Sequence, residues 1–232
     1  QARQMALDHL AAQVPDDALR AKLTPRYEIG CKRVLLSNEF YPALATPGST
    51  LEPSALESVE GSTVTAASGA QYTLDALVFA TGFEVTQPPS SERIHDATGR
   101  SLAQAWSAGM KALDSITGAG FPNLFLINGP NTGLGHHSMV YMIEAQVDYI
   151  LGALDHAATQ AVPVLHARPE AQEAYVADMY ARSEATVWLA GGCSSWYLDP
   201  RNGQQTVLWP DFAYAFRDEN AAFDPAAYRA EA

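Results

Sequence analysis

The stretch over residues 124–156, LFLINGPNTGLGHHSMVYMIEAQVDYILGALDH, decides the fold. It opens with the apolar run 124–127, continues through a turn-rich segment with glycines, and ends in apolar residues at helical spacing. This order predicts a buried strand, a glycine-rich loop and a helix over about 138–156. One helical stripe holds most of the large apolar side chains, which predicts a central helix; it comprises Val140, Ile143, Val147, Ile150, Leu151 and Leu154.

The glycine-rich loop before this helix is a candidate ligand site. Glycines let the backbone approach a ligand closely, and the free N–H groups at a helix start favour an anionic or electron-rich group. The alternative interpretation is a tight strand-to-helix connection with no ligand, because glycine-rich loops are common.

The flanking segments predict further helices and strands, and together an α/β protein. Residues 2–23 are helical in pattern, with a break at 14–17 where Pro15 suits the first turn of a second helix. Short apolar runs predict buried strands at 33–37 and 76–80, and alternating residues predict a hairpin of 62–67 with 70–74. A helical turn is expected at 41–44 and a helix at about 169–184.

Composition narrows the possible partners. The formal charge of -12 repels phosphate backbones and anionic membrane surfaces, so we expect neither nucleic acid nor membrane as a partner. Cys31 and Cys193 lie far apart in the sequence, and we expect free thiols in a reducing, cytoplasmic compartment. The pair His136-His137 suggests a metal, but adjacent helical side chains diverge by about 100°, so no metal is expected.

Several motifs occur in an order that resembles flavin-containing and Baeyer-Villiger monooxygenases. They cover most of residues 26–200, and the ordered set is specific where each single motif is weak. The motifs are Tyr27 to Arg33 (YEIGCKR), Tyr41-Pro42, Leu77 to Phe83 (LVFATGF), Phe121 to Phe125 (FPNLF), Gly129-Pro130-Asn131, Gly135-His136 and Ser195-Trp196-Tyr197.

This resemblance implies an FAD- and NADPH-dependent monooxygenase. It implies C-terminal portions of two Rossmann-like dinucleotide-binding domains in a glutathione-reductase-like architecture, with residues 1–80 ending the NADPH-binding domain and 81–232 ending the FAD-binding domain. The reaction would insert one oxygen atom from O2 through a flavin C4a-peroxide, most simply beside the carbonyl of a small ketone. The alternatives are N- or S-oxygenation, or a non-enzymatic fragment or binding module that needs a separate N-terminal partner.

The resemblance also assigns roles to single residues. Arg33 would be catalytic, because guanidinium keeps its positive charge beside a peroxide anion at every working pH. Lys32 would contact the ribose phosphate of NADPH, and Trp196 would close over that cofactor. The remaining cofactor-binding candidates are Thr81, Gly82, Gly129, Asn131, Thr132, His136, Ser138 and Met139. Without the resemblance, the Lys-Arg pair could be a surface pair and Trp196 a packing residue.

The sequence departs from the family pattern in one important respect. It contains no Gly-x-Gly-x-x-Gly fingerprint, and the nearest segment, Gly118-Ala119-Gly120, follows no convincing strand. We therefore expect the two dinucleotide fingerprints upstream of Gln1, in a missing N-terminal part of the same enzyme. The chain alone should then lack the usual pyrophosphate cradle and be inactive.

Overall fold

The computed structural model describes residues 1–135 and 137–231 and shows a mixed α/β protein. The chain forms two compact units. The first comprises Gln1–Arg26 with Leu35–Phe83, and the second comprises Tyr27–Val34 with the chain from Glu84 onward. The short segment 27–34 therefore belongs to the second unit, while both of its flanks belong to the first.

Helices α1 (Ala2–Gln13), α2 (Asp17–Leu23) and α3 (Phe40–Leu44) belong to the first unit. The expected break between the first two helices is confirmed. The side chain of Asp16 accepts hydrogen bonds from the backbone N–H groups of Ala18 and Leu19, which makes Asp16 the N-cap of α2. Pro15 thus precedes the cap, and its expected place in the first helical turn is wrong.

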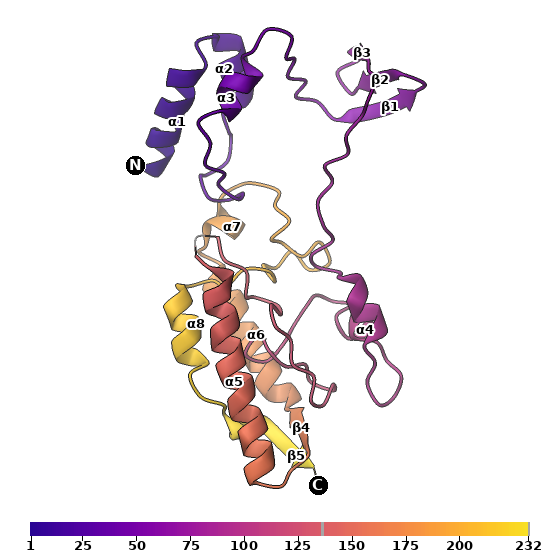
Figure 1. Cartoon of the computed structure of the whole chain (residues 1–232), viewed down its shortest axis with the longest axis vertical. Coiled ribbons are helices and arrows are strands. Elements are labelled where there is room, and N and C mark those ends of the chain that lie inside the picture. The colour runs from indigo at the N-terminus through magenta and orange to yellow at the C-terminus, as the bar shows by residue number, and fades with distance from the viewer. Residues whose placement is uncertain (136, 232) are drawn as a thin grey trace. The chain divides into compact units, whose positions relative to one another are not determined.

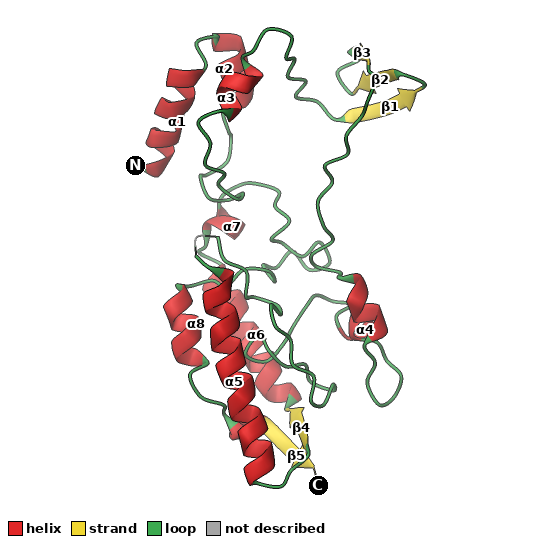
Figure 2. Cartoon of the chain, viewed as in Figure 1, coloured by secondary structure: helices red, strands yellow, loops and turns green. Residues whose placement is uncertain are grey.

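The first unit also contains a three-stranded antiparallel sheet, drawn yellow in Figure 2, of order β1-β2-β3. The expected hairpin is confirmed as β2 (Thr63–Ala66) and β3 (Gln71–Thr73). The sequence pattern did not indicate β1 (Leu56–Glu60), all of whose residues are exposed.

The second unit is built on the long helix α5 (Met139–Thr159), which packs beside α8 (Ala213–Glu219) (Figure 1). The expected helix over 169–184 is present as α6 (Pro169–Ser183), and β4 (Val164–Ala167) pairs antiparallel with β5 (Tyr228–Glu231). Shorter elements are α4 (Leu102–Ala105), α7 (Val187–Ala190) and 3-10 turns at Pro89–Arg93 and Pro225–Ala227. None of the described helices combines the length and apolar character needed to cross a membrane.

Helix α5 buries a different face from the one its large aliphatic residues predicted. Its inward residues Met142, Ala145, Tyr149 and Ala153 recur every three or four positions and join two hydrophobic clusters with α6, α8, β4 and β5. In the expected stripe, by contrast, Val140, Leu151 and Leu154 are more than half exposed. The helix was predicted correctly, but the buried stripe was wrong within this chain.

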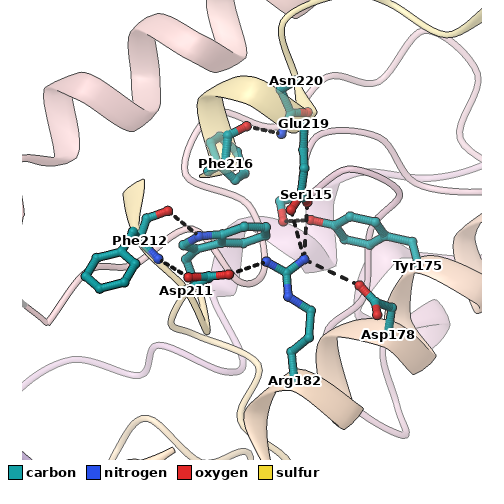
Figure 3. Close-up of polar contacts among 10 residues, drawn as sticks. Ser115, Tyr175, Asp178, Arg182, Asp211, Phe212, Phe216, Glu219 and Asn220 are labelled. Atoms are coloured by element: carbon teal, nitrogen blue, oxygen red, sulfur yellow. Dashed lines mark hydrogen bonds and ion pairs between the residues drawn. The ribbon is translucent and has the colours of Figure 1, made fainter. Parts of the chain in front are cut away.

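Arg182 on α6 ties α6 to α8 and to the segment between them (Figure 3). Its guanidinium pairs with Glu219 at 3.0 Å, Asp211 at 3.3 Å and Asp178 at 3.4 Å, and lies 4.5 Å from the ring centroid of Trp209. The indole N–H of Trp209 donates to the carbonyl of Phe212. One cation thus joins three carboxylates and a fully buried aromatic ring.

Three expected strands are not strands in the structure: residues 33–37, 76–80 and 124–127. Leu36, Val78 and Phe79 are 95%, 86% and 67% exposed, and the third segment makes only an isolated bridge between Phe125 and Thr117. An apolar run becomes a strand only when a neighbouring strand accepts and donates its backbone hydrogen bonds. The described part of this chain offers these segments no such neighbour.

Candidate functional site

The glycine-rich segment 128–135 is pinned against a second loop, residues 205–209. The N–H of Asn131 donates to the carbonyl of Thr206 at 2.9 Å, the N–H of Gly133 to that of Val207 at 2.8 Å, and the N–H of Trp209 to that of Gly133 at 2.8 Å. A Cβ at Gly133 would lie 2.9 Å from the Val207 carbonyl oxygen. This glycine is needed because two protein segments meet there closely.

Asn131 and Thr132 are buried inside this junction. Asn131 has a positive φ of 58°, and its side-chain amide donates to the carbonyl oxygens of Gln205 at 3.0 Å and Leu208 at 3.1 Å. The Thr132 hydroxyl donates to the carbonyl of Gly129 at 2.7 Å. Both side chains hold the loop in shape, so their assignment to cofactor binding stays a prediction.

The loop leads to the start of α5. Ser138 is the N-cap and is exposed, and among the described residues its side chain forms no capping hydrogen bond. Met139 is partly buried against the cluster around Trp209. His136, another candidate, lies outside the described residues. The first turn of α5 therefore presents N–H groups that its cap residue leaves available.

Arg33 lies at this loop, although the two are far apart in sequence. Its guanidinium Nη1 donates to the carbonyl of Leu134 at 2.7 Å, and the residue as a whole is exposed. Lys32 places its ammonium 5.2 Å from the ring centroid of Tyr27. The structure thus brings the predicted arginine to the glycine-rich loop and leaves the lysine on the surface of the same segment.

Cys31 and Cys193 form a disulfide with a Cα–Cα distance of 6.1 Å. The expectation of two free thiols is wrong, because the fold brings together residues 162 positions apart, which spacing alone does not reveal. Gly191 makes room for the bond: a Cβ there would lie 3.0 Å from the Cys31 sulfur. The N–H of Glu28 also donates to the carbonyl of Gly191 at 2.9 Å.

An aromatic cluster extends from this disulfide-linked loop to the glycine-rich segment. Trp196 is 55% exposed and its ring centroid lies 4.4 Å from that of Tyr197, which is buried and contacts Trp188 edge-on at 6.3 Å. A Cβ at Gly135 would lie only 3.2 Å from the Trp188 ring. Sequence reasoning gave Trp188 no role, and its one signal was its position eight residues before Trp196.

A buried ion pair holds the base of the Trp196 loop. Asp199 is fully buried, and Arg201 donates to it through Nε at 2.8 Å and Nη2 at 2.5 Å. The guanidinium also donates to the carbonyls of Trp106 at 2.7 Å and Thr86 at 2.6 Å. Burial alone would raise the pKa of Asp199, but the bonds from Arg201 prevail and lower it. Sequence reasoning missed this pair.

The remaining candidates lie elsewhere. Thr81 and Gly82 belong to the first unit, where both are exposed and Gly82 has a positive φ of 76°. Within residues 1–135 and 137–231, no three His, Cys, Asp or Glu side chains gather in a way that could hold a metal ion. The candidate site is the second-unit cluster of segment 27–34, the glycine-rich loop, the start of α5 and the Trp196 loop.

This arrangement suits a planar group that becomes negatively charged. A permanently charged guanidinium and the positive end of the α5 dipole stabilise negative charge, while Trp188 and Trp196 supply aromatic surface. The described residues fit the planar ring of a dinucleotide cofactor such as a flavin. They offer no glycine fingerprint for a pyrophosphate.

No family model matches the chain, but comparison with known proteins finds relatives that share one name. The chain is 46% identical over 227 residues to a Baeyer-Villiger monooxygenase of Streptomyces coelicolor and 41% identical over 226 residues to one of Pseudomonas aeruginosa. Each match covers 97% of this chain but only 44% and 43% of the relative. The chain thus spans less than half the length of these relatives.

Solved structures share the fold. An oxidized steroid monooxygenase bound to NADP aligns with a TM-score of 0.82 at 24% identity, over 99% of this chain and 44% of that one. OTEMO in complex with FAD and NADP aligns with a TM-score of 0.86 at 20% identity, over the same shares. At these identities the likeness concerns the fold alone.

Proposed function

Because this chain belongs to the Baeyer-Villiger monooxygenase family, we propose that it is part of an enzyme that uses FAD, NADPH and O2 to oxidise a small ketone. The observation that carries the proposal is the 2.7 Å hydrogen bond from Arg33 to the Leu134 carbonyl, which sets a guanidinium beside the glycine-rich loop. Bound FAD would supply electron storage and oxygen activation.

Arg33 would act through its charge. Its guanidinium is anchored at one nitrogen by the Leu134 carbonyl, and its other nitrogens would donate to negative charge that develops on oxygen. The first turn of α5 would add its dipole from Ser138 onward. Trp196, more than half exposed, would cover NADPH and exclude water, and Lys32 would bind its phosphate.

The finer fold assignment and the partner belong to the same proposal. We assign the two units to the ends of Rossmann-like NADPH-binding and FAD-binding domains, divided near residues 80 and 81. The partner would be the rest of the same enzyme, carrying both dinucleotide fingerprints. Exposed apolar residues in the unpaired runs, such as Leu36, Val78 and Ile127, support this, because a sheet continued by that partner would cover them.

The test is Arg33→Ala in the complete enzyme, assayed with a panel of small ketones. Ester or lactone formed per NADPH consumed should fall at least about a hundredfold, comparable to removing one oxyanion donor at about 3 kcal/mol, while NADPH still reduces the flavin in stopped flow. Arg33→Lys should rescue little, because an ammonium lacks the planar fork.

The matched control is Arg229→Ala, which removes an exposed arginine from β5. It should couple NADPH to product as the parent does. If Arg33→Ala does the same, Arg33 is not catalytic. If the parent enzyme yields no oxygenated product from any ketone, the proposed reaction itself is wrong.

A further inference from the structure

We propose that the Cys31–Cys193 disulfide is a reducible clamp that positions Arg33 and Trp196 together. Cys31 lies two residues before Arg33, and Cys193 three residues before Trp196. One covalent bond therefore joins the segment that carries the candidate catalytic cation to the loop that carries the exposed indole. The inference rests on the proposed function for the meaning of these two side chains, but the clamp itself is a property of this chain.

The segment 27–34 needs such an anchor because of its connections. Its neighbours on both sides, Arg26 and Leu35, belong to the other unit, so the chain enters and leaves the second unit within eight residues. The non-covalent bonds that attach it to the second unit include Glu28 N–H to the Gly191 carbonyl and Arg33 to the Leu134 carbonyl. Each such bond contributes little net, so a covalent bond between the same two parts of the chain strengthens the attachment of this segment.

The surroundings of the disulfide are built for it. Cys31 is fully buried, and Gly191 is the residue that leaves space for its sulfur. A Cβ at Gly30 would already lie 3.5 Å from Val187, so the segment packs directly on α7. The disulfide thus holds segment 27–34 against α7 and the loop that follows it. In this position Arg33 reaches the carbonyl of Leu134 in the glycine-rich loop.

The unequal burial of the two cysteine residues predicts how the clamp opens. Cys193 is only partly buried, so a thiolate of a dithiol reductant would attack its sulfur and expel Cys31 as the thiolate. The second thiol of the reductant then breaks the mixed disulfide and releases Cys193. Two electrons and two protons pass from the dithiol to the protein, which gains two thiols, while the reductant becomes a cyclic disulfide.

The first experiment uses the 232-residue chain without cofactor. When the chain is denatured without reductant, a thiol-alkylating reagent should label no cysteine. After treatment with dithiothreitol, the same reagent should label two. In the native chain, dithiothreitol should accelerate amide hydrogen exchange in residues 27–34 and 191–197 by about tenfold or more, with little change at 131–133 and 205–209. Two labels before reduction, or equal exchange after it, would overturn the clamp.

The second experiment uses the complete enzyme, with the Cys31→Ala/Cys193→Ala double variant as control for packing. Dithiothreitol should lower product formed per NADPH about threefold or more while the rate of flavin reduction holds, and reoxidation with oxidised glutathione should restore coupling. The double variant should show the low yield of product per NADPH without any treatment, and neither dithiothreitol nor oxidised glutathione should change it. If the double variant forms as much product per NADPH as the oxidised parent, the disulfide does not position the two side chains and is only a structural bond.

The two experiments separate this inference from the proposed function. An enzyme that makes no oxygenated product refutes the reaction, yet labelling and exchange still decide whether the clamp exists. Conversely, normal oxygenation by the double variant refutes the positioning role and leaves the reaction intact.

Discussion

Replacing Arg201 with methionine should strongly destabilise the second unit. The substitution keeps much of the side-chain length but leaves the fully buried Asp199 carboxylate without its two guanidinium hydrogen bonds. The carbonyls of Trp106 and Thr86 lose their donors as well. Breaking a buried pair from one side costs about 3–5 kcal/mol, because the remaining charge stays desolvated.

The magnitude is set by burial and not by the number of bonds. Arg201 is itself 18% exposed, so water can reach part of the vacated space, and we expect the lower half of that range, about 3 kcal/mol. The matched control is Lys111→Met, which removes the cation of an ion pair whose partner Glu173 is 57% exposed. That change should cost at most about 1 kcal/mol.

The assay is urea unfolding of the chain, followed by tryptophan fluorescence and analysed by linear extrapolation. Heating should show the same order, with the transition of the Arg201 variant lower by roughly 10 °C. If Arg201→Met loses no more stability than Lys111→Met, the ion pair does not hold the loop base and our reasoning from burial is refuted.

The same pair predicts a pH dependence with a definite sign. Since the folded-state pKa of Asp199 is lowered, its contribution is fully present above its unfolded-state value of about 3.9 and is lost as pH falls toward its lower folded-state pKa. Asp199→Asn removes this contribution. The gap in unfolding free energy between parent and variant should therefore shrink as pH falls below about 4, and a gap that widens there would contradict the assignment.

Three further predictions follow from the structure. Arg182→Leu should keep apolar contact with Trp209 but leave three half-exposed carboxylates close together, and we expect a loss of about 1–2 kcal/mol in urea unfolding; no loss would mean solvent screens the network. Trp196→Ala in the complete enzyme should weaken NADPH use by about 1–2 kcal/mol in kcat/KM with FAD still bound, whereas unchanged kinetics would make Trp196 a packing residue. The purified chain with FAD, NADPH and a ketone should form no product, and oxygenation by it would show that the fingerprints are dispensable.

Local signals in the sequence predicted elements that local forces decide. The helix after Ser138, the helix that begins at Pro169 and the hairpin around Ser68-Gly69 are all present. A helix satisfies its backbone hydrogen bonds within itself, and a hairpin within a few residues, so neighbouring residues are enough to define them.

The candidate site was predictable only in part, because its contacts span the chain. The motif around Arg33 and the glycine-rich loop were each visible, but their contact joins residues 101 positions apart. The disulfide and the Asp199–Arg201 anchor to Thr86 likewise depend on the completed fold. Ordinary single residues such as Trp188 carry no pattern that marks such a contact in advance.

The errors in predicting burial share a physical cause. Apolar runs at 33–37 and 76–80, and the outer stripe of α5, carry large aliphatic side chains that this chain leaves exposed, Leu36 at 95% and Leu151 at 58%. Apolar patterns are selected by the surroundings of the complete folded protein. The chain spans 44% of its Streptomyces coelicolor relative, and the partner proposed above would supply the surroundings that cover these residues. The exposed residues are therefore where the proposed partner should protect backbone amides from exchange. Unchanged protection of these segments in the complete enzyme would contradict that proposal.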